Sequence, residues 1–360
     1  MTDLSTFCVK PSATLREVMT RLNRNQKGIV LVTDAGGQLA GTVTDGDIRR
    51  ALLADRNLEA PVSELLKDKQ GSNFAQPVTA PLGTAPDVLL SLLREKGILQ
   101  VPLVDDQGRV AGLTTLDELV PDRALPLQAV IMAGGKGTRL KPLTENLPKP
   151  MLPVGGRPLM EHIIDQLRTS GVKRVSVATH FMPERITEHF GDGSGFGVEL
   201  SYIEEQQPLG TAGALSLMAP SGEPMLVING DILTQVDFRT MLAFHREHKA
   251  DLTVAVRKYD VNVPYGVVRS DGVQVRDLAE KPVYQFLVNA GIYLLEPGSF
   301  AHVPKGRRFD MTDLIKSLIE AGRSVVSFPV LEYWLDVGQH GDYEQAKQDH
   351  ENGRIGKREG

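Results

Sequence analysis

The chain has 360 residues, of which 41% are hydrophobic and 24% are charged, and this length suits two or three domains. Its net charge of −5 gives no basis for nucleic-acid binding, and its single cysteine, Cys8, excludes an intramolecular disulfide. Because the sequence shows neither a secretory leader nor a run of ~18 apolar residues, we expect a cytoplasmic protein without a membrane segment.

The first 120 residues contain a weak internal repeat. Gly28–Ile48 and Gly97–Leu119 each predict an apolar strand, a turn, a second strand that ends in Thr, and an acidic helix start. Aligning the two copies makes Thr44 and Thr115 equivalent. A β-β-α unit of this size cannot bury its apolar face alone, so we expect the copies to pack together. A packed pair that binds no ligand is an alternative.

The segment Gly41-Thr42-Val43-Thr44-Asp45-Gly46-Asp47-Ile48-Arg49-Arg50 resembles a CBS (cystathionine-β-synthase-type) domain. The pair at 1–120 then resembles a regulatory Bateman module, which implies an adenine nucleotide as ligand. That resemblance places Thr44 and Asp47 at the ribose and makes Thr115 a ligand in the second copy. Glu118 stands where the pattern has Asp, so the second copy departs from the pattern at this position.

A second domain is expected at 127–345, after a proline-bracketed linker at 121–126. Short apolar strands alternate there with helical stretches, which predicts an α/β fold with a mostly parallel sheet. The expected strands are 127–133, 175–178, 225–228 and 252–256, with a helix at 159–170. Residues 346–360 are expected to form a charged tail, helical at first and disordered from Gly353.

The strongest pattern is the glycine-rich loop after the first of these strands. Gly134, Gly135 and Gly137 allow backbone N–H groups to surround phosphate oxygens, and Lys136, Arg139 and Lys141 add positive charge. The loop matches neither the Walker A nor the dinucleotide pattern. A tight turn with solvated basic residues is the alternative.

This loop, followed by Pro148-Lys149-Pro150-Met151-Leu152-Pro153-Val154, resembles the sugar nucleotidyltransferase family. The resemblance extends to Gly338 and implies a Rossmann-like core that joins a nucleoside triphosphate to a sugar 1-phosphate and releases pyrophosphate. It implies catalytic roles for Arg139 and Lys149 near the reacting phosphates. It places the nucleotide against Ala133, Gly134, Gly135, Gly137, Thr138, Gly210 and Thr211.

Two aspartates predict a magnesium site. Asp231 follows an apolar strand, and a carboxylate at the carboxyl end of a parallel strand faces the crevice where ligands bind. Asp231 and Asp336 match the family's metal-binding aspartates in order, and Mg²⁺ needs only one or two carboxylates when phosphate oxygens complete its shell. Either residue alone is explained equally well as the cap of a turn.

The sugar pocket is implied by three further matches. Glu280-Lys281-Pro282 resembles a family segment in which Lys281 binds the sugar phosphate and is counted as catalytic, while Glu280 binds sugar hydroxyls. Asn289 is a further hydroxyl ligand, and the Gly266 backbone approaches the sugar. A structural turn or strand position is the alternative for each.

Glu205 indicates the base. The resemblance places this residue at the base edge, and a carboxylate only accepts hydrogen bonds. Guanine offers two adjacent donors, whereas uracil and thymine flank one donor with carbonyl oxygens. A mispaired buried polar group costs about 1–3 kcal/mol, which favours GTP. The alternative is a solvated loop charge.

With the CBS pair attached, the chain resembles glucosamine-1-phosphate guanylyltransferases of legionaminic acid synthesis. Mannose- or heptose-1-phosphate guanylyltransferases and uridylyl- or thymidylyltransferases remain open. A nucleotide sensor with an inactive transferase fold is a separate alternative. We expect a homo-oligomer that binds neither nucleic acid nor membrane.

Overall fold

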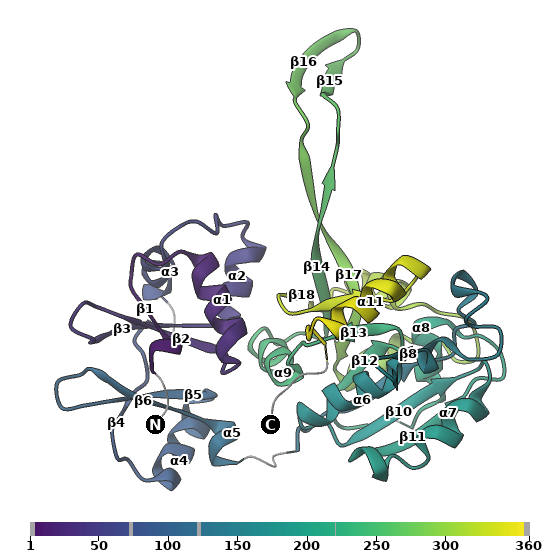
Figure 1. The fold of residues 1–360 in the computed structure, drawn as a ribbon, viewed down its shortest axis with the longest axis horizontal. Coiled ribbons are helices and arrows are strands. Elements are labelled where there is room, and N and C mark those ends of the chain that lie inside the picture. The colour runs from purple at the N-terminus through teal and green to yellow at the C-terminus, as the bar shows by residue number, and fades with distance from the viewer. Residues whose placement is uncertain (1–3, 72–74, 121–123, 220, 356–360) are drawn as a thin grey trace. The chain divides into compact units, whose positions relative to one another are not determined.

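The computed structural model describes residues 4–71, 75–120, 124–219 and 221–355. The chain divides into two compact units, one ending at Ala124 and one beginning at Leu125 (Figure 1). Most of the linker expected at 121–126 lies outside the described residues, because these leave out 121–123. Leu125 already belongs to the second unit, where its N–H donates to the Gly171 carbonyl at 2.8 Å.

The first unit contains two similar halves. One sheet has the order β1-β2-β3 and the other β4-β5-β6; in each, the first pair is parallel and the second is an antiparallel hairpin with a bulge at the equivalent place. The strands are β1 Cys8–Val9, β2 Ile29–Thr33, β3 Leu39–Thr44, β4 Ala80–Pro81, β5 Gln100–Val104 and β6 Val110–Thr115. The helices are α1 Leu15–Asn25, α2 Asp45–Leu53, α3 Val62–Asp68, α4 Pro86–Lys96 and α5 Leu116–Leu119.

The two halves pack against each other, as the repeat predicted. Gln38 and Arg109 form an isolated antiparallel bridge between them. Leu113 from the second half joins Phe7, Ile29 and Leu31 from the first in one buried cluster. Each half therefore covers apolar surface that the other leaves exposed.

The second unit is built on a seven-stranded sheet with the order β11-β10-β7-β12-β17-β14-β18. Only β17 runs antiparallel to its neighbours, which confirms the mostly parallel sheet. The strands are β7 Gln128–Met132, β10 Arg174–Thr179, β11 Glu199–Glu204, β12 Met225–Asn229, β14 Leu252–Asn262, β17 Val283–Leu295 and β18 Val325–Pro329.

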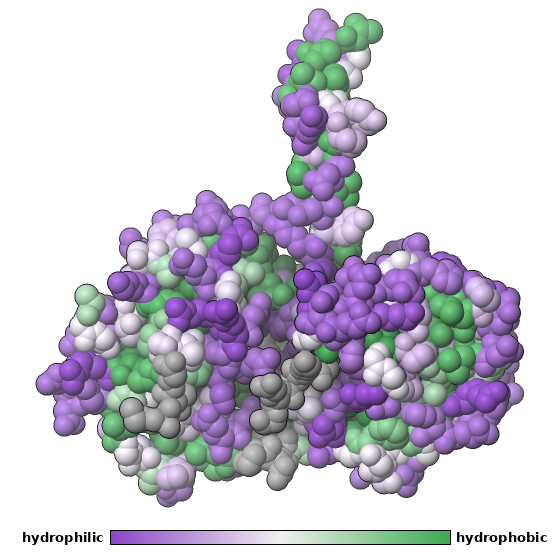
Figure 2. All heavy atoms as spheres, viewed as in Figure 1, coloured by the Kyte–Doolittle hydropathy of each residue, from purple (hydrophilic) through white to green (hydrophobic). Residues whose placement is uncertain are grey.

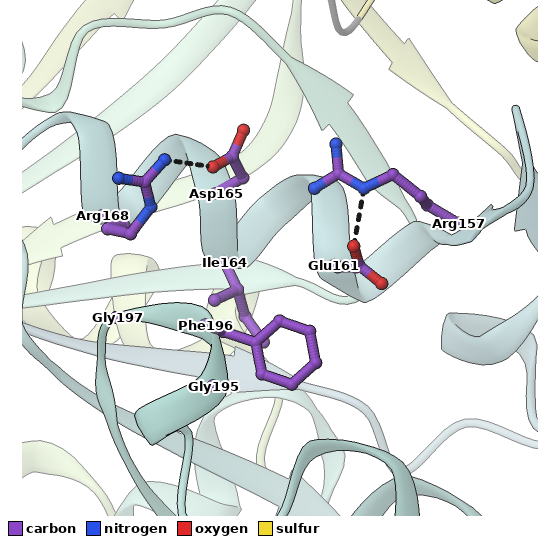
Figure 3. Close-up of a pocket in the computed structure, with 8 residues that line it drawn as sticks. All are labelled: Arg157, Glu161, Ile164, Asp165, Arg168, Gly195, Phe196 and Gly197. Atoms are coloured by element: carbon purple, nitrogen blue, oxygen red, sulfur yellow. Dashed lines mark hydrogen bonds and ion pairs between the residues drawn. The ribbon is translucent and has the colours of Figure 1, made fainter.

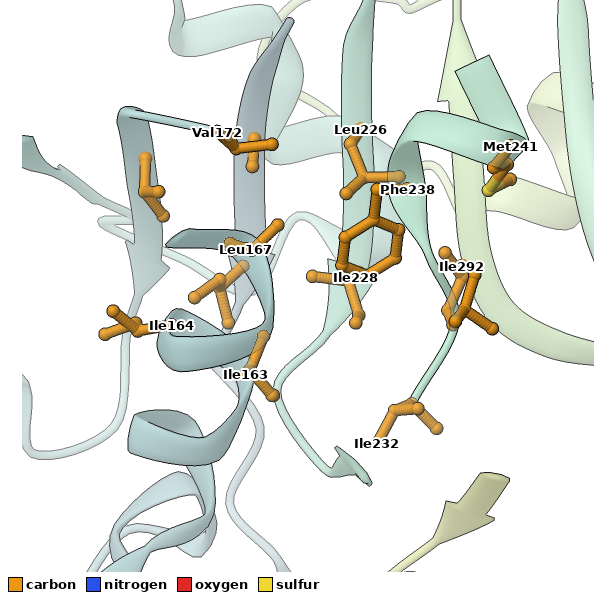
Figure 4. Close-up of a cluster of buried hydrophobic side chains, with 14 of the residues drawn as sticks. Ile163, Ile164, Leu167, Val172, Leu226, Ile228, Ile232, Phe238, Met241 and Ile292 are labelled. Carbon is orange, nitrogen blue, oxygen red and sulfur yellow. The ribbon is translucent and has the colours of Figure 1, made fainter. Parts of the chain in front are cut away.

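Alternate strand residues supply two core layers, because successive side chains point to opposite sheet faces. Ile131, Ile228 and Ile292 face a layer with α6 Leu159–Thr169, α7 Pro183–Phe190 and α9 Phe238–Glu247. Figure 4 shows Ile228 and Ile292 of this cluster with side chains of α6 and α9. Val130, Val227 and Tyr293 face the layer with α8 Gly210–Gly213 and α10 Met311–Glu320. Helices thus cover both faces, as expected for a three-layer α/β fold.

Two boundaries differ from the sequence predictions. The strand expected at 252–256 continues to Asn262 and pairs with β17 as a long ribbon. That ribbon ends in the hairpin of β15 Val267–Asp271 and β16 Gln274–Ala279. We call residues 257–288 the arm; it projects away from the α/β core (Figure 1).

The first residues of the charged tail expected at 346–360 belong to the folded domain. Helix α11 spans His340–Glu351, and Ala346 and Ile355 are buried in one apolar cluster with Leu140, so this segment is part of the domain. The disorder expected from Gly353 does not apply to 353–355, and 356–360 lie outside the described residues. Within the part of the chain that the structure describes, no helix is long and apolar enough to cross a bilayer.

Candidate active site

The predicted catalytic lysine and one predicted metal ligand form an ion pair. Lys149 Nζ lies 2.5 Å from Asp231 Oδ2, and only 8% of the Lys149 surface is exposed, so Lys149 is not a solvated charge. Pro148 and Pro150 flank Lys149 at the start of a short 3-10 helix, Lys149–Met151. Asp231 follows β12, and Gly230 between them donates its N–H to the Met132 carbonyl at 2.9 Å. The turn after β12 and the 3-10 helix in the segment after β7 thus bring these side chains together.

Asp336 lies beside this pair. It ends β19 (Trp334–Asp336), which pairs antiparallel with β13 (Ile232–Thr234) so that Asp336 is opposite Ile232. The Val337 N–H also donates to the Asp231 carbonyl at 3.0 Å. Desolvation and the nearby charge of Asp231 raise the pKa of Asp336, against the lowering effect of Lys149 and Arg139. Two carboxylates and two cations therefore share one site.

The two predicted metal ligands satisfy one requirement of a divalent cation site. Asp231 Oδ1 is buried and accepts no hydrogen bond from the described residues. A buried oxygen without a donor costs free energy that a cation would recover. Among the described residues, no group of three or more His, Cys, Asp or Glu side chains has metal-binding geometry.

The glycine-rich loop is closed around its neighbours rather than extended. Gly137 has a φ of 61°, and a Cβ there would lie 2.9 Å from Thr144 Cγ2 and 3.1 Å from Lys149 Cβ. Thr144 Oγ1 donates to the Gly137 carbonyl at 2.8 Å. Gly135, by contrast, borders open space, where a ligand could approach the backbone. Ala133 is buried, whereas Thr138 and Arg139 are exposed.

Glu205 is buried at the same edge of the sheet. It follows β11, is 6% exposed, and accepts the Leu209 N–H through Oε2 at 2.8 Å, so the solvated-charge alternative is wrong. Burial raises the pKa of Glu205, and the Leu209 hydrogen bond partly offsets this. A Cβ at Gly134 would lie 2.9 Å from Glu205 Oε1, which places this carboxylate against the glycine-rich loop.

Gly210 and Thr211 make contacts within the fold. Thr211 donates its N–H to Asp310 Oδ1 at 3.0 Å and accepts the Met311 N–H at 2.9 Å. Gly210 has a φ of 79° and faces the Phe309 carbonyl and Asp310. These bonds join α8 to the start of α10, so any nucleotide contact from this pair is additional to a structural one.

The predicted sugar ligands are not all brought to the core. Asn289 lies at the base of the arm, where its amide donates to the Tyr293 hydroxyl at 2.8 Å and accepts the Gly291 N–H. Gly266, Glu280 and Lys281 flank the β15–β16 hairpin at the far end of the arm (Figure 1). In a single chain these three residues therefore stand apart from Lys149 and Asp231.

Three neighbours of the site were not predicted. Asn229 ends β12 and has a buried Oδ1 that accepts no hydrogen bond from the described residues. His180 borders Gly134 and bonds the Glu205 carbonyl through Nδ1 at 2.8 Å. Asp342 approaches Gly338 beside Asp336 and Arg139. The position of Asn229 at a strand's carboxyl end was the one available signal.

In the first unit, the predicted ribose ligands act as helix caps. Thr44 and Asp47 form a reciprocal capping box at α2, as Thr115 and Glu118 do at α5. Asp47 is 3% exposed and also pairs with Lys69 at 2.7 Å. Burial opposes ionisation of Asp47, but the charge and hydrogen bond of Lys69 hold its pKa below the ordinary value.

One open hollow of about 450 Å³ lies away from these residues, between α6 and the 3-10 helix Ser194–Phe196 (Figure 3). None of the predicted site residues lines it. Its two arginines, Arg157 and Arg168, are each paired with a carboxylate of α6 at 2.6 Å. The hollow therefore presents balanced charge.

Comparison with known proteins agrees with this arrangement. Residues 128–353 match the profile of the nucleotidyl transferase family, which is more than half of the chain. The chain belongs to the nucleotidyl transferase family. Residues 1–54 and 74–121 match the CBS domain profile, which agrees with the two halves of the first unit.

Relatives in this family carry several substrate names. A mannose-1-phosphate guanylyltransferase of Mycobacterium tuberculosis is 32% identical over 231 residues, covering 62% of this chain and 64% of that protein. A UTP–glucose-1-phosphate uridylyltransferase of Synechocystis is 32% identical over 245 residues, covering 61% and 62%. The chain thus matches under two thirds of the length of these relatives.

A solved structure from Bacillus anthracis, assigned as a glucose-1-phosphate thymidylyltransferase and bound to sucrose, superimposes with a TM-score of 0.53. It is 25% identical and covers 64% of this chain and 98% of that one. The likeness supports the Rossmann-like nucleotidyltransferase core, with the CBS pair as the additional N-terminal unit.

Proposed function

We propose that this protein is an enzyme that transfers a nucleotidyl group from a nucleoside triphosphate to a sugar 1-phosphate. A sugar-phosphate oxygen forms a bond to the α-phosphorus, the bond to the bridging oxygen of the β-phosphate breaks, and pyrophosphate leaves. The observation that carries the proposal is the Lys149–Asp231 pair beside Asp336, next to the glycine-rich loop. Such a reaction needs positioning and neutralisation of charge more than covalent help.

Four charged residues of the candidate active site have roles in this proposal. Arg139, exposed on the loop, holds the triphosphate, and the open side of Gly135 accepts a phosphate oxygen at the backbone. Lys149, held by Asp231, neutralises charge at the reacting phosphates. Asp231 and Asp336 would hold a divalent cation, Mg²⁺ in our proposal, which neutralises the developing negative charge when bound.

GTP is the proposed donor. Glu205 is buried beside Gly134, one of its oxygens accepts the Leu209 N–H, and no donor among the described residues is assigned to the other. A carboxylate at this place accepts hydrogen bonds but cannot donate them, which suits the adjacent N1–H and N2–H groups of guanine. The candidate sugar substrates are glucosamine, mannose and heptose 1-phosphates. The product would supply surface-glycan or nonulosonic acid synthesis.

The test is a substrate panel on the full chain. Pyrophosphate release is measured with GTP, UTP, dTTP, ATP and CTP, each combined with glucosamine, mannose, heptose and glucose 1-phosphates. The proposal predicts release that requires both substrates and a divalent cation, fastest with GTP. Equal rates with UTP or dTTP would refute the GTP assignment, and no release with any pair would refute the reaction.

We further propose that the CBS pair adjusts this activity by binding an adenine nucleotide. The site at Thr44 and Asp47 is occupied by a capping box and by Lys69, so a ribose there must displace the Lys69–Asp47 contact. Allostery requires that the two sites be energetically coupled. ATP, ADP and AMP should each be tested for a change in kcat/KM and in Tm. No change in either quantity would contradict regulation.

A further inference from the structure

The arm exposes more apolar surface than an isolated domain usually leaves in water. Tyr259, Tyr265 and Phe286 are 57%, 75% and 55% exposed. At 150–250 Å² for each aromatic side chain, these three alone leave roughly 300–450 Å² uncovered. The exposed aliphatic residues of the arm add to this area: Val261, Val268, Val273, Val275, Leu278, Val283 and Leu287. The apolar patches of monomers rarely exceed a few hundred Å².

The ladder between β14 and β17 sorts the arm's side chains onto two unlike faces. Residues directly opposite each other in an antiparallel pair point to the same face. One face carries Tyr259 opposite Phe286 and Val261 opposite Tyr284; we call it the aromatic face. The reverse face is mainly polar: its pairs are Lys258 with Leu287, Asp260 with Gln285, and Asn262 with Val283.

This ribbon has no third strand along its length. Beyond Val256 and Asn289, β14 and β17 are paired only with each other among the described residues. A two-stranded ribbon is marginally stable in water, and an uncovered aromatic face adds to that instability. The arm therefore requires a surface that covers the aromatic face.

The charges of the arm favour a second copy of the same chain as its partner. Five basic and four acidic residues lie between positions 257 and 288, which gives almost no net charge. At the tip, Arg276 pairs with Asp271 at 3.1 Å, and Arg269 lies opposite Asp277. An acidic or basic macromolecule would find no complementary field here. A two-fold dimer, by contrast, requires one self-complementary patch, and an apolar face of balanced charge meets that requirement.

The tip of the arm carries two of the proposed substrate ligands, which in a single chain lie apart from the rest of the candidate active site. The proposed sugar and phosphate ligands Glu280 and Lys281 lie there, and Lys281 adopts a left-handed backbone with a φ of 43°. That conformation is uncommon for a residue other than glycine and often marks a functional position. The arm also leaves the sheet at the carboxyl end of β14, the edge at which β7 and β12 end and beyond which Asp231 follows β12 and pairs with Lys149.

We propose that two copies of this chain pack their arms together through the aromatic faces, and that each arm carries its tip to the active site of the other copy. The paired segments span six residues on each strand, about 20 Å. A two-fold axis across the arms would set the tip of one over the base of the other, beside Asn289 of the second copy. The trans site rests on the proposed function; the arm interface does not.

The interface is tested by particle mass in solution, with light scattering on the full chain. Phe286→Ser changes the aromatic face, and Leu287→Ser is the matched control because it is 53% exposed on the reverse face. The proposal predicts that Phe286→Ser halves the particle mass of the wild type and that Leu287→Ser leaves it unchanged. A monomeric wild type, or an unchanged mass for Phe286→Ser, would overturn it.

The trans site is tested by mixing two variants. Asp231→Asn replaces a proposed metal ligand in the α/β core, and Lys281→Ala replaces the proposed phosphate-binding lysine at the tip of the arm. If arms act in trans, each variant alone has little activity, and an equilibrated equal mixture regains about a quarter of wild-type activity, because half of the dimers contain one complete site. A mixture no more active than its components, or full activity of Lys281→Ala, would overturn the trans site. An inactive wild type would instead refute the proposed function, and the mass measurement would still decide the interface.

Discussion

Lys149 Nζ and Asp231 Oδ2 lie 2.5 Å apart, although 82 residues separate them in the chain. Asp231 lies just after β12, and Lys149 lies in the segment that follows the neighbouring parallel strand β7, at the start of the 3-10 helix Lys149–Met151. Lys149 therefore occupies one oxygen of a carboxylate that the proposed metal also requires. This competition links the charge of one residue to the affinity of the site for a cation.

Replacing Lys149 should separate metal binding from catalysis. Lys149→Met removes the ammonium from Asp231, so Mn²⁺ should bind the nucleotide-free protein roughly tenfold more tightly, about 1.4 kcal/mol. The same change should lower kcat/KM by roughly 100–1,000-fold, because charge on the reacting phosphates loses its neutralisation. Calorimetry gives the affinity and pyrophosphate release gives the rate. The control Lys173→Met, at an exposed position on the same unit, should change neither the Mn²⁺ affinity nor kcat/KM. Weaker Mn²⁺ binding by Lys149→Met would contradict the competition between Lys149 and the metal for Asp231.

Two glycines of the candidate active site should respond differently to replacement by alanine. A Cβ at Gly135 meets nothing within 4 Å, so Gly135→Ala should leave Tm unchanged but raise KM for the nucleotide, because a ligand approaches there. At Gly230 the Cβ would lie 2.9 Å from the Met132 carbonyl oxygen, so Gly230→Ala should lower stability by about 1–3 kcal/mol. Thermal unfolding and steady-state kinetics measure both. An unchanged KM for Gly135→Ala would show that no phosphate approaches this backbone.

Glu205 should determine which base is accepted. Glu205→Gln replaces an acceptor-only group with one that also donates, so the ratio of kcat/KM for GTP over UTP should fall by roughly 10–100-fold, equal to about 1–3 kcal/mol. Its neighbour Glu204 is exposed, and Glu204→Gln should leave the ratio unchanged. Should both variants keep the wild-type ratio, Glu205 does not contact the base.

The buried His245 should make the stability of the second unit depend on pH. It is 1% exposed and bonds Thr253 Oγ1 at 2.7 Å and Glu296 Oε1 at 3.1 Å. Burial lowers the pKa of His245, against the raising effect of Glu296. Since the unfolded chain then binds the proton more readily, stability is retained above the unfolded pKa of about 6.5 and lost below it.

The loss attributed to His245 is at most about 1.4 kcal/mol for the first pH unit below about 6.5. His245→Gln should be less stable at neutral pH but should lose less further stability on acidification. Tm measured for both proteins at about pH 7.5 and about pH 5.5 compares these slopes. Identical slopes would mean that folding does not lower the pKa of His245.

Much of this account was accessible from the sequence, for reasons that individual residues show. The strand before Gly134 and the periodic helix at Ile163, Ile164 and Leu167 are local patterns, and the structure contains them as β7 and α6. The order of strands is not a local property. For that reason the sequence predicted Lys149 and Asp231 separately, without their contact.

The arm is the part of the fold that the sequence did not predict. Alternation of polar and apolar residues continues past Val256 through Tyr259 and Val261, but such a pattern normally predicts a strand with one face on its own core. Here the apolar face has no core beneath it. The sequence prediction ended this strand at 256, and it grouped Glu280 and Lys281 with the other site residues without placing them at the end of an arm. Figure 2 shows the exposed apolar residues that this arrangement leaves along the arm.

The most direct test of the central claim is sugar-dependent pyrophosphate release by the full chain, compared between the wild type and Asp231→Ala. With GTP, a divalent cation and the best sugar 1-phosphate of the panel, we predict release by the wild type and a rate at least roughly 100-fold lower for Asp231→Ala. Asp165→Ala, at an exposed carboxylate of α6 outside the site, should match the wild type. Equal rates for wild type and Asp231→Ala, with or without the sugar phosphate, would contradict nucleotidyl transfer at this site.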